Sequence, residues 1–225
     1  MNEYTKALIS YFETLVTPNK LQRMHEVLAQ RTRKISVVIE EPYHDANVSA
    51  ILRSAEGFGV QDIHLIESYN QSSFKVGIAR GSDQWLSISR HTEKNASETC
   101  LQKFKEDGYR VVATVPDRDA LSISDVSLDK PIALVFGNER LGISQTVREQ
   151  ADIFATIPMV GFTESLNVSV AAGTILYDLV HRLKKERNDW RLSTEEIDHI
   201  KLQWFRIIIN SCEEHEKRFL EQFTK

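Results

Sequence analysis

The chain has 225 residues, of which 41% are hydrophobic, and a formal net charge of −4. This length and composition allow a sizeable core, in one domain with additions or in two small ones. They exclude a membrane-spanning protein, whose helices need roughly 20 consecutive apolar residues, and a secreted disulfide scaffold, because Cys100 and Cys212 are the only cysteines and both lie in apolar helical patterns. We therefore expect a soluble cytoplasmic protein.

Two helices are predicted before the first strand. Apolar residues recur at helical spacing over residues 4–15, and Thr17 and Pro18 supply an N-cap and a first-turn proline for a second helix. Basic side chains gather near the end of this region, at Lys20, Arg23, Arg31, Arg33 and Lys34. Such a run is either a solvated helix face or a phosphate-binding patch, and the pattern leaves both open.

Short apolar strands then alternate with helices from residue 35 to about residue 180. The predicted strands cover residues 36–40, 63–67, 85–89, 110–115, 132–136 and 154–157. A loop and short helix carrying Lys75 and Arg80 is expected before the third strand, and a polar loop over residues 116–130. The alternation is typical of an α/β domain with a mostly parallel sheet, whose ligands bind at the carboxyl ends of the strands.

The most informative stretch reads IPMVGFTESLNVSVAA, over residues 157–172. It predicts a strand end, a loop and a buried helix, and backbone N–H groups at such a junction are available to a ligand. Ser165 and Asn167 are also good N-cap residues, so either they only start the helix or they have a functional role.

A capping box at residues 193–196 predicts one long C-terminal helix with an apolar stripe that ends at Phe223. The seven histidines show no spacing typical of metal ligands, so each is expected to be an ordinary surface or core residue. The chain contains no nucleophile elbow and no Walker loop.

Three segments, in this order, resemble the motifs of the SpoU family of RNA ribose 2'-O-methyltransferases, part of the SPOUT class. They read NVSAILR (residues 47–53), LVFGNERLG (residues 134–142) and IPMVGFTESLNVSVA (residues 157–171). Each lies at a predicted strand-to-helix junction, and the similarity covers roughly residues 20–190. Within the family, the run over residues 23–67 and the helical additions at both ends are most similar to the tRNA (guanosine-18) 2'-O-methyltransferases.

The resemblance implies a SPOUT fold, in which a mostly parallel α/β sheet ends in a C-terminal trefoil knot, within a homodimer. It divides the chain into an N-terminal helical extension (1–34), a methyltransferase domain (35–188) and a C-terminal helical extension (189–225). The continuous apolarity of residues 168–180 suits a helix that lies between its own sheet and a second subunit.

The implied reaction is methyl transfer from S-adenosyl-L-methionine to a ribose 2'-hydroxyl, at guanosine 18 in the D loop of tRNA. The positions that match the family's cofactor-binding residues are Thr114, Gly137, Ile157 and Leu166. Those that match its catalytic and substrate-contacting residues are Asn47, Arg53, Glu139, Ser165 and Asn167.

Arg53 carries the most weight in this hypothesis. The resemblance makes it the catalytic base, although a guanidinium stays protonated in proteins. A role that is physically easier is to bind an RNA phosphate bidentately and stabilise the developing alkoxide, and both roles stay open. The basic runs at residues 20–34 and 181–191 are expected to help grip the tRNA.

Plainer interpretations remain. Arg53 pairs with Glu56 on its own helix in one of them, Glu139 is a turn residue, and Asn47 caps its helix. The alternative functions are methylation of ribosomal RNA or of another tRNA position, and an inert RNA-binding SPOUT protein. A general nucleotide-binding module is disfavoured because the glycine fingerprint is missing.

Overall fold

The computed structural model describes residues 3–69 and 81–223, so the loop and helix expected around Lys75 and Arg80 lie outside the described residues. The chain forms two compact units. One contains residues 32–190, and the other combines the segments before residue 32 and after residue 190. No helix among the described residues is both long and apolar enough to cross a membrane.

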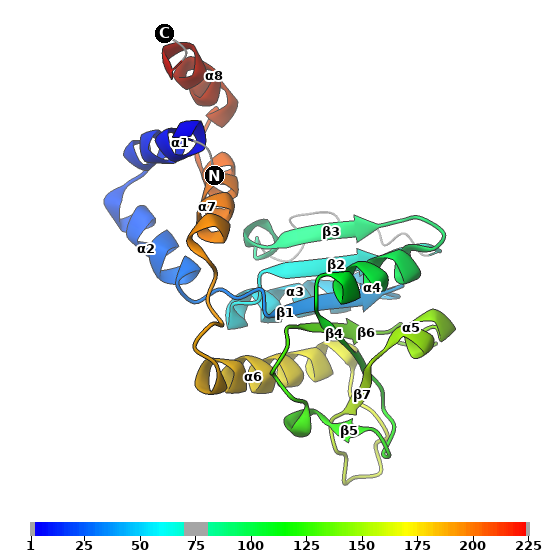
Figure 1. The fold of residues 1–225 in the computed structure, drawn as a ribbon. Coiled ribbons are helices and arrows are strands. Elements are labelled where there is room, and N and C mark those ends of the chain that lie inside the picture. The colour runs from blue at the N-terminus through cyan, green and yellow to red at the C-terminus, as the bar shows by residue number, and fades with distance from the viewer. Residues whose placement is uncertain (1–2, 70–80, 224–225) are drawn as a thin grey trace. The chain divides into compact units, whose positions relative to one another are not determined.

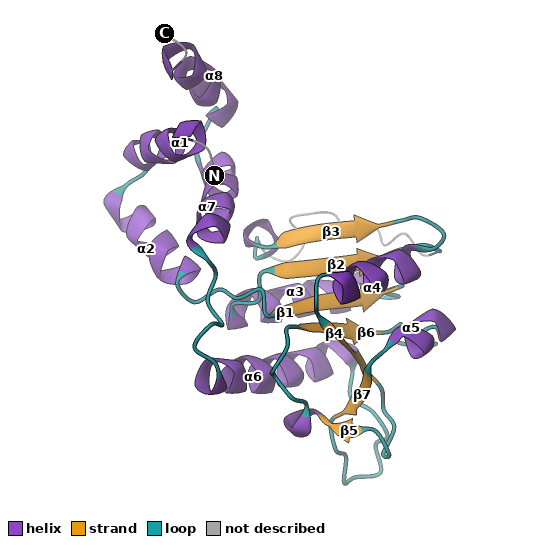
Figure 2. Ribbon diagram, viewed as in Figure 1, coloured by secondary structure: helices purple, strands orange, loops and turns teal. Residues whose placement is uncertain are grey.

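The larger unit is built on one sheet, which the orange arrows of Figure 2 mark. In the described part of the chain its seven strands follow the order β3-β2-β1-β6-β4-β7-β5, and every neighbouring pair is parallel. Their bounds are β1 (Ile35–Glu40), β2 (Asp62–Ile66), β3 (Ser87–His91), β4 (Arg110–Thr114), β5 (Leu121–Ser122), β6 (Ile132–Phe136) and β7 (Ile153–Thr156). The predicted α/β class is therefore confirmed.

Helices cover both faces of this sheet (Figure 1). One face packs against α3 (Asp45–Phe58) and α6 (Val168–Glu186), the other against α4 (Ala96–Glu106) and α5 (Gln145–Gln150). Strand β1 is buried along its whole length because its side chains alternate between the two cores, Val37 and Ile39 in one and Val38 in the other.

The centre of the sheet is a topological switch point. From β1 the chain goes through α3 to β2 on one side, whereas β6, the other neighbour of β1, pairs with β4 on the opposite side. A crevice at the carboxyl ends of the strands is expected at such a point, and this is where the predicted loops meet. The trefoil knot stays a prediction.

Residues 116–130 are more ordered than expected of a polar loop. They contain β5, which extends the sheet beyond β7, and a 3-10 helix, η2 (Ile123–Asp125). Ile123, Val126 and Leu128 are buried in the core shared with α6. Their wide spacing among polar residues hides this from a periodicity analysis.

The smaller unit contains α1 (Glu3–Thr14), α2 (Pro18–Leu28), α7 (Thr194–Ile208) and α8 (Cys212–Phe223). Both predicted caps are present, because Thr17 accepts a hydrogen bond from the Lys20 N–H group and Ser193 forms the capping box with Glu196. The prediction of one long C-terminal helix was wrong. The helix ends at Ile208, and a new one starts after Ser211, whose φ of 52° lies in the left-handed region.

Candidate functional site

A cavity of about 660 Å³ lies at the carboxyl edge of the sheet, between the loops that follow β1, β4, β6 and β7 and the start of α6. This volume is typical of sites that bind ligands of nucleoside size or larger. Eight of the nine predicted site residues line the cavity, namely Asn47, Thr114, Gly137, Glu139, Ile157, Ser165, Leu166 and Asn167.

Glu139 joins the loop after β6 to the start of α3. Its Oε2 accepts a hydrogen bond from the Tyr43 N–H group at 2.8 Å, and its Oε1 accepts one from the His44 N–H group at 3.2 Å. Burial raises the pKa of Glu139, but hydrogen bonds from the Asn47 amide and these backbone groups outweigh it and hold the pKa below its usual range. The carboxylate is thus ionised at neutral pH, and it is more than a turn residue.

Asn47 connects Glu139 to the third motif. Its Nδ2 donates to Glu139 Oε1 at 2.8 Å, and its Oδ1 accepts from Asn167 Nδ2 at 3.2 Å. Asn47 does not cap α3, because the helix begins at Asp45 after an N-cap at His44. Asn167 is the N-cap of α6, with its Oδ1 accepting from the N–H and hydroxyl groups of Ser169. The prediction of a capping role is confirmed for Asn167 and wrong for Asn47.

The loop after β6 closes on itself around Gly137 and Asn138. The N–H of Asn138 donates to the Gly142 carbonyl at 3.0 Å, and the N–H of Gly142 donates back at 2.8 Å. A Cβ at Gly137 would lie 2.5 Å from both the carbonyl carbon of Gly142 and the nitrogen of Ile143. Only glycine fits there, because the backbone of the loop passes so close.

Sequence reasoning missed Glu40, a buried carboxylate at the end of β1. Its Oε2 accepts from the Ser144 N–H at 2.9 Å, and its Oε1 accepts from the hydroxyls of Ser144 and Ser97 at 2.6 and 2.7 Å. Glu40 therefore fixes the far end of the loop that carries Gly137 and Glu139. The sequence contained one indication of this role, because Glu40 is a charged residue at the end of an otherwise mostly apolar strand.

The remaining predicted cofactor residues supply apolar and backbone surface. Ile157 and Leu166 are half-buried at the cavity wall. The hydroxyl of Thr114 already donates to the Val135 carbonyl at 3.0 Å, which leaves its methyl group for a ligand. Apolar walls beside a tight glycine loop fit the adenosine and methionine parts of S-adenosyl-L-methionine. Ser165 is exposed at the rim.

Arg53 is the one predicted site residue that the fold of a single chain does not bring to the cavity. It is exposed on α3 and does not line the cavity. No ion pair joins it to Glu56 in the described residues, so the plainer interpretation of Arg53 also finds no support.

Several side chains of the two predicted basic runs form ion pairs or ring contacts within the protein. Arg31 is buried beside the ring of Trp204, at 5.6 Å from its centroid. Ion pairs join Arg33 to Asp62, Lys34 and Arg187 to Asp189, and Arg182 to Asp178 and Glu186. These side chains already have partners within the chain, and the role of the two basic runs in gripping RNA stays a prediction.

The chain is similar to known RNA methyltransferases. Residues 34–177 match the model of the SpoU rRNA Methylase family. The tRNA (guanosine(18)-2'-O)-methyltransferase of Borreliella burgdorferi is 32% identical over 203 residues, which cover 90% of this chain and 92% of that protein. The enzyme of the same name from Aquifex aeolicus is 35% identical over 196 residues, covering 85% and 91%.

Solved structures of SpoU methyltransferases are also similar to this chain. The A. aeolicus TrmH/SpoU tRNA modifying enzyme has a TM-score of 0.74 and 32% identity, covering 85% of this chain and 98% of that one. The SpoU methyltransferase AviRb from Streptomyces viridochromogenes, in complex with the cofactor AdoMet, has a TM-score of 0.59 and 25% identity, covering 72% of this chain and 62% of that one.

Proposed function

This chain belongs to the SpoU methylase family, and on that premise we propose that it is a tRNA (guanosine(18)-2'-O)-methyltransferase that uses S-adenosyl-L-methionine. The B. burgdorferi and A. aeolicus relatives with this name match over 92% and 91% of their length. The observation that carries the proposal is the hydrogen-bonded series Glu139–Asn47–Asn167, which joins all three motifs at one cavity.

The cavity is suited to hold the donor. When bound, S-adenosyl-L-methionine supplies an electrophilic methyl group on its sulfonium, so the protein has to align donor and acceptor and exclude water. In the proposal, the loop at Gly137 holds the cofactor through its backbone, and Ile157, Leu166 and the methyl group of Thr114 form the apolar wall.

Glu139 and Asn47 act as positioning residues. Both Glu139 oxygens already accept hydrogen bonds from Tyr43, His44 and Asn47, and the low pKa makes the carboxylate a weak base. Its role is to fix Asn47, which in turn orients the Asn167 amide beside exposed Ser165. The ribose would lie against Ser165 and Asn167, and its 2'-hydroxyl proton would pass to a phosphate oxygen or to water.

We infer that the active form is a homodimer. Arg53 lies outside the cavity of its own chain, so a second copy would have to bring an arginine there. Large apolar side chains are also exposed in the same unit, at Leu141, Val160, Phe162, Val170 and Tyr177. Large apolar side chains left exposed in this number suit a surface that a second subunit covers.

The tRNA would be held partly by basic residues near the cavity. Arg140 and Arg148 line it, and Arg140 packs over the ring of Tyr43 at 5.0 Å from the centroid. With Arg53 they could contact several phosphates, which suits recognition of a folded RNA by its backbone.

The direct test is incubation of the protein with unmodified tRNA and methyl-labelled S-adenosyl-L-methionine, followed by mapping of the labelled nucleotide. Label on the ribose of guanosine 18 supports the proposal. Label at another tRNA position, or only on ribosomal RNA, would show that the substrate is not guanosine 18. Cofactor binding without transfer to any RNA would indicate a catalytically inert RNA-binding protein. A transcript in which guanosine 18 carries no 2'-hydroxyl is the matched control substrate.

Subunit exchange tests the dimer. Arg53→Ala and Asn167→Ala chains are each expected to be inactive alone. If Arg53 acts across the interface, a mixed dimer contains one intact site, and an equal mixture after exchange should recover about a quarter of the activity. No recovery, despite mixed dimers detected by native mass spectrometry, would place Arg53 with its own cavity.

A further inference from the structure

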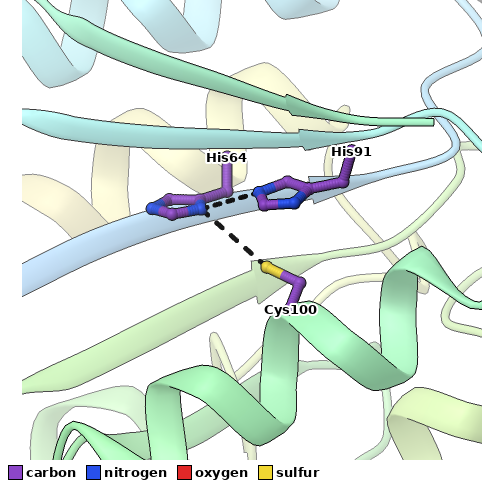
Figure 3. A group of neighbouring side chains, drawn as sticks. All are labelled: His64, His91 and Cys100. Atoms are coloured by element: carbon purple, nitrogen blue, oxygen red, sulfur yellow. Dashed lines mark hydrogen bonds between the residues drawn. The ribbon is translucent and has the colours of Figure 1, made fainter. Parts of the chain in front are cut away.

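Two histidines and a cysteine come together away from the cavity, although their spacing in the sequence gives no metal signature. Figure 3 shows His64 on β2, His91 on β3 and Cys100 on α4, with the thiol pointing toward the two rings. His64 Nδ1 lies 2.9 Å from His91 Nε2 and 3.8 Å from Cys100 Sγ. All three candidate ligand atoms lie within 4.8 Å of one another.

The fold holds these residues in place. Strands β2 and β3 are parallel with Ile66 opposite His91, so His64 and His91 point to the same face of the sheet. Helix α4 covers that face, and buried Phe104 lies one turn after Cys100 and packs against the His64 ring with its centroid at 4.7 Å. The rings of His64 and His91 are nearly parallel, at 10°.

We propose that His64, His91 and Cys100 form a binding site for a thiophilic divalent cation of the zinc type. Two imidazole nitrogens and a thiolate are typical zinc ligands, and a solvent molecule can take the fourth position. Around a tetrahedral zinc ion, such atoms lie roughly 3.3–3.6 Å apart, so the three side chains need to move by less than about 1 Å.

Each of the three side chains can present the atom that a metal needs. The 2.9 Å contact between His64 Nδ1 and His91 Nε2 is a hydrogen bond, so one of these nitrogens carries a proton, which moves to the other nitrogen of its own ring when an ion replaces the bond. The Cys100 thiol loses its proton to solvent on coordination, because the thiolate is the metal ligand.

The role of the ion would be structural. Strand β3 is at the edge of the sheet and pairs only with β2 among the described strands. None of the three ligands lines the cavity. An ion bound here would tie the edge strand to β2 and to α4, which adds binding free energy to folding.

The first experiment uses the full-length protein under reducing conditions, loaded with Co²⁺ as a spectroscopic substitute for Zn²⁺. We expect the ultraviolet charge-transfer absorption of a cobalt–thiolate bond, at one ion per chain, and its loss when Zn²⁺ is added. With Zn²⁺ at about a hundredfold excess over its dissociation constant, the unfolding midpoint should rise by roughly 5–10 °C relative to a chelator-treated sample.

The two cysteines provide a matched pair of variants. Cys100→Ser should abolish the cobalt–thiolate absorption and the zinc-dependent rise, whereas Cys212→Ser, which removes the other buried thiol, should keep both. His91→Gln should weaken zinc binding by at least about tenfold. Absence of the absorption in the unsubstituted protein would overturn the proposal even if a variant failed to fold. So would its persistence in Cys100→Ser or its loss in Cys212→Ser.

Discussion

The side-chain amide of Asn47 donates a 2.8 Å hydrogen bond to the carboxylate of Glu139, 92 positions further along the chain. This bond joins the beginning of α3 to the loop after β6, and Asn167 extends it to the beginning of α6. Three motifs that are far apart in the sequence thereby become one rigid edge of the cavity. Because the acceptor at one end of this series is the ionised carboxylate of Glu139, the arrangement can be tested by pH and by substitution.

Glu139→Gln should remove a pH-dependent part of the folding free energy. Burial raises the pKa of Glu139, but the hydrogen bonds from Asn47, Tyr43 and His44 leave it lower than usual. A carboxyl group whose pKa is lowered on folding contributes stability above its unfolded pKa and loses it as the pH falls through the folded pKa. This contribution should be constant from neutral pH to about pH 5 and decline below that.

Urea unfolding at several pH values measures the effect. Near pH 7 the substitution should cost about 1–2 kcal/mol, and the difference from the unsubstituted protein should shrink in acid. Glu221→Gln, at an exposed position of α8, is the control for loss of one charge. An equal cost at every pH would mean that the charge of Glu139 contributes nothing to stability.

Gly137→Ala should weaken cofactor binding. The added Cβ would lie 2.5 Å from two backbone atoms of residues 142 and 143, so the loop has to shift. We expect a loop displacement of about 1 Å to lower the affinity for S-adenosyl-L-methionine on the order of 10- to 100-fold, which calorimetry would detect. In Gly57→Ala the new methyl group meets no atom within 4 Å, so that helix variant should bind normally and gain up to about 1 kcal/mol of stability. Normal affinity in Gly137→Ala would argue against a cofactor at this loop.

Arg53→Ala should abolish methyl transfer while cofactor affinity stays within about threefold, because the guanidinium lies away from the cavity that would hold the cofactor. Arg53→Lys distinguishes a requirement for positive charge from a requirement for bidentate phosphate binding. It keeps the charge but loses bidentate phosphate binding, so tRNA affinity should fall less than in Arg53→Ala while the rate of transfer stays low. Transfer rates under single-turnover conditions and tRNA binding by filter retention provide both readouts. Full activity of Arg53→Ala would remove the residue from the mechanism.

The parallel sheet was predictable because strands such as Ile132–Phe136 are continuous apolar runs between helical patterns. The meeting of the loops at one edge followed from topology alone. The position of Arg53 was also open to prediction. It follows Asn47 by six residues, which is about 9 Å along the helix and about 120° around it, so the two side chains leave the helix in different directions.

Other features depend on tertiary contacts that no local pattern contains. His64 and His91 meet only because β2 and β3 pair in a particular register, and Cys100 joins them from a helix on the same face. The hydrogen bonds of Glu40 to Ser97 and Ser144 likewise cross 57 and 104 positions. The break after α7 escaped notice because serine does not signal a left-handed backbone as glycine or asparagine does.

The break between α7 and α8 contains Ser211. Ser211 has a φ of 52°, a conformation that strains a residue with a Cβ, and its side chain makes no hydrogen bond to any described residue. Ser211→Gly should relieve the strain, and part of the gain is offset by the greater freedom of glycine in the unfolded chain. The expected net effect is a stabilisation of about 0.5–1 kcal/mol, measured as a rise in the midpoint of thermal unfolding.

Ser10→Gly is the matched control, because Ser10 lies inside α1, where the same substitution should cost about 0.5 kcal/mol. If glycine stabilises the protein at residue 211 and destabilises it at residue 10, the backbone conformation at each position decides the change in stability. If both substitutions destabilise the protein, the left-handed conformation of Ser211 is not a source of strain. The end of α7 at Ile208 would then be explained by tertiary packing, such as that of the Tyr11 ring on the Phe219 ring, whose centroids are 5.2 Å apart.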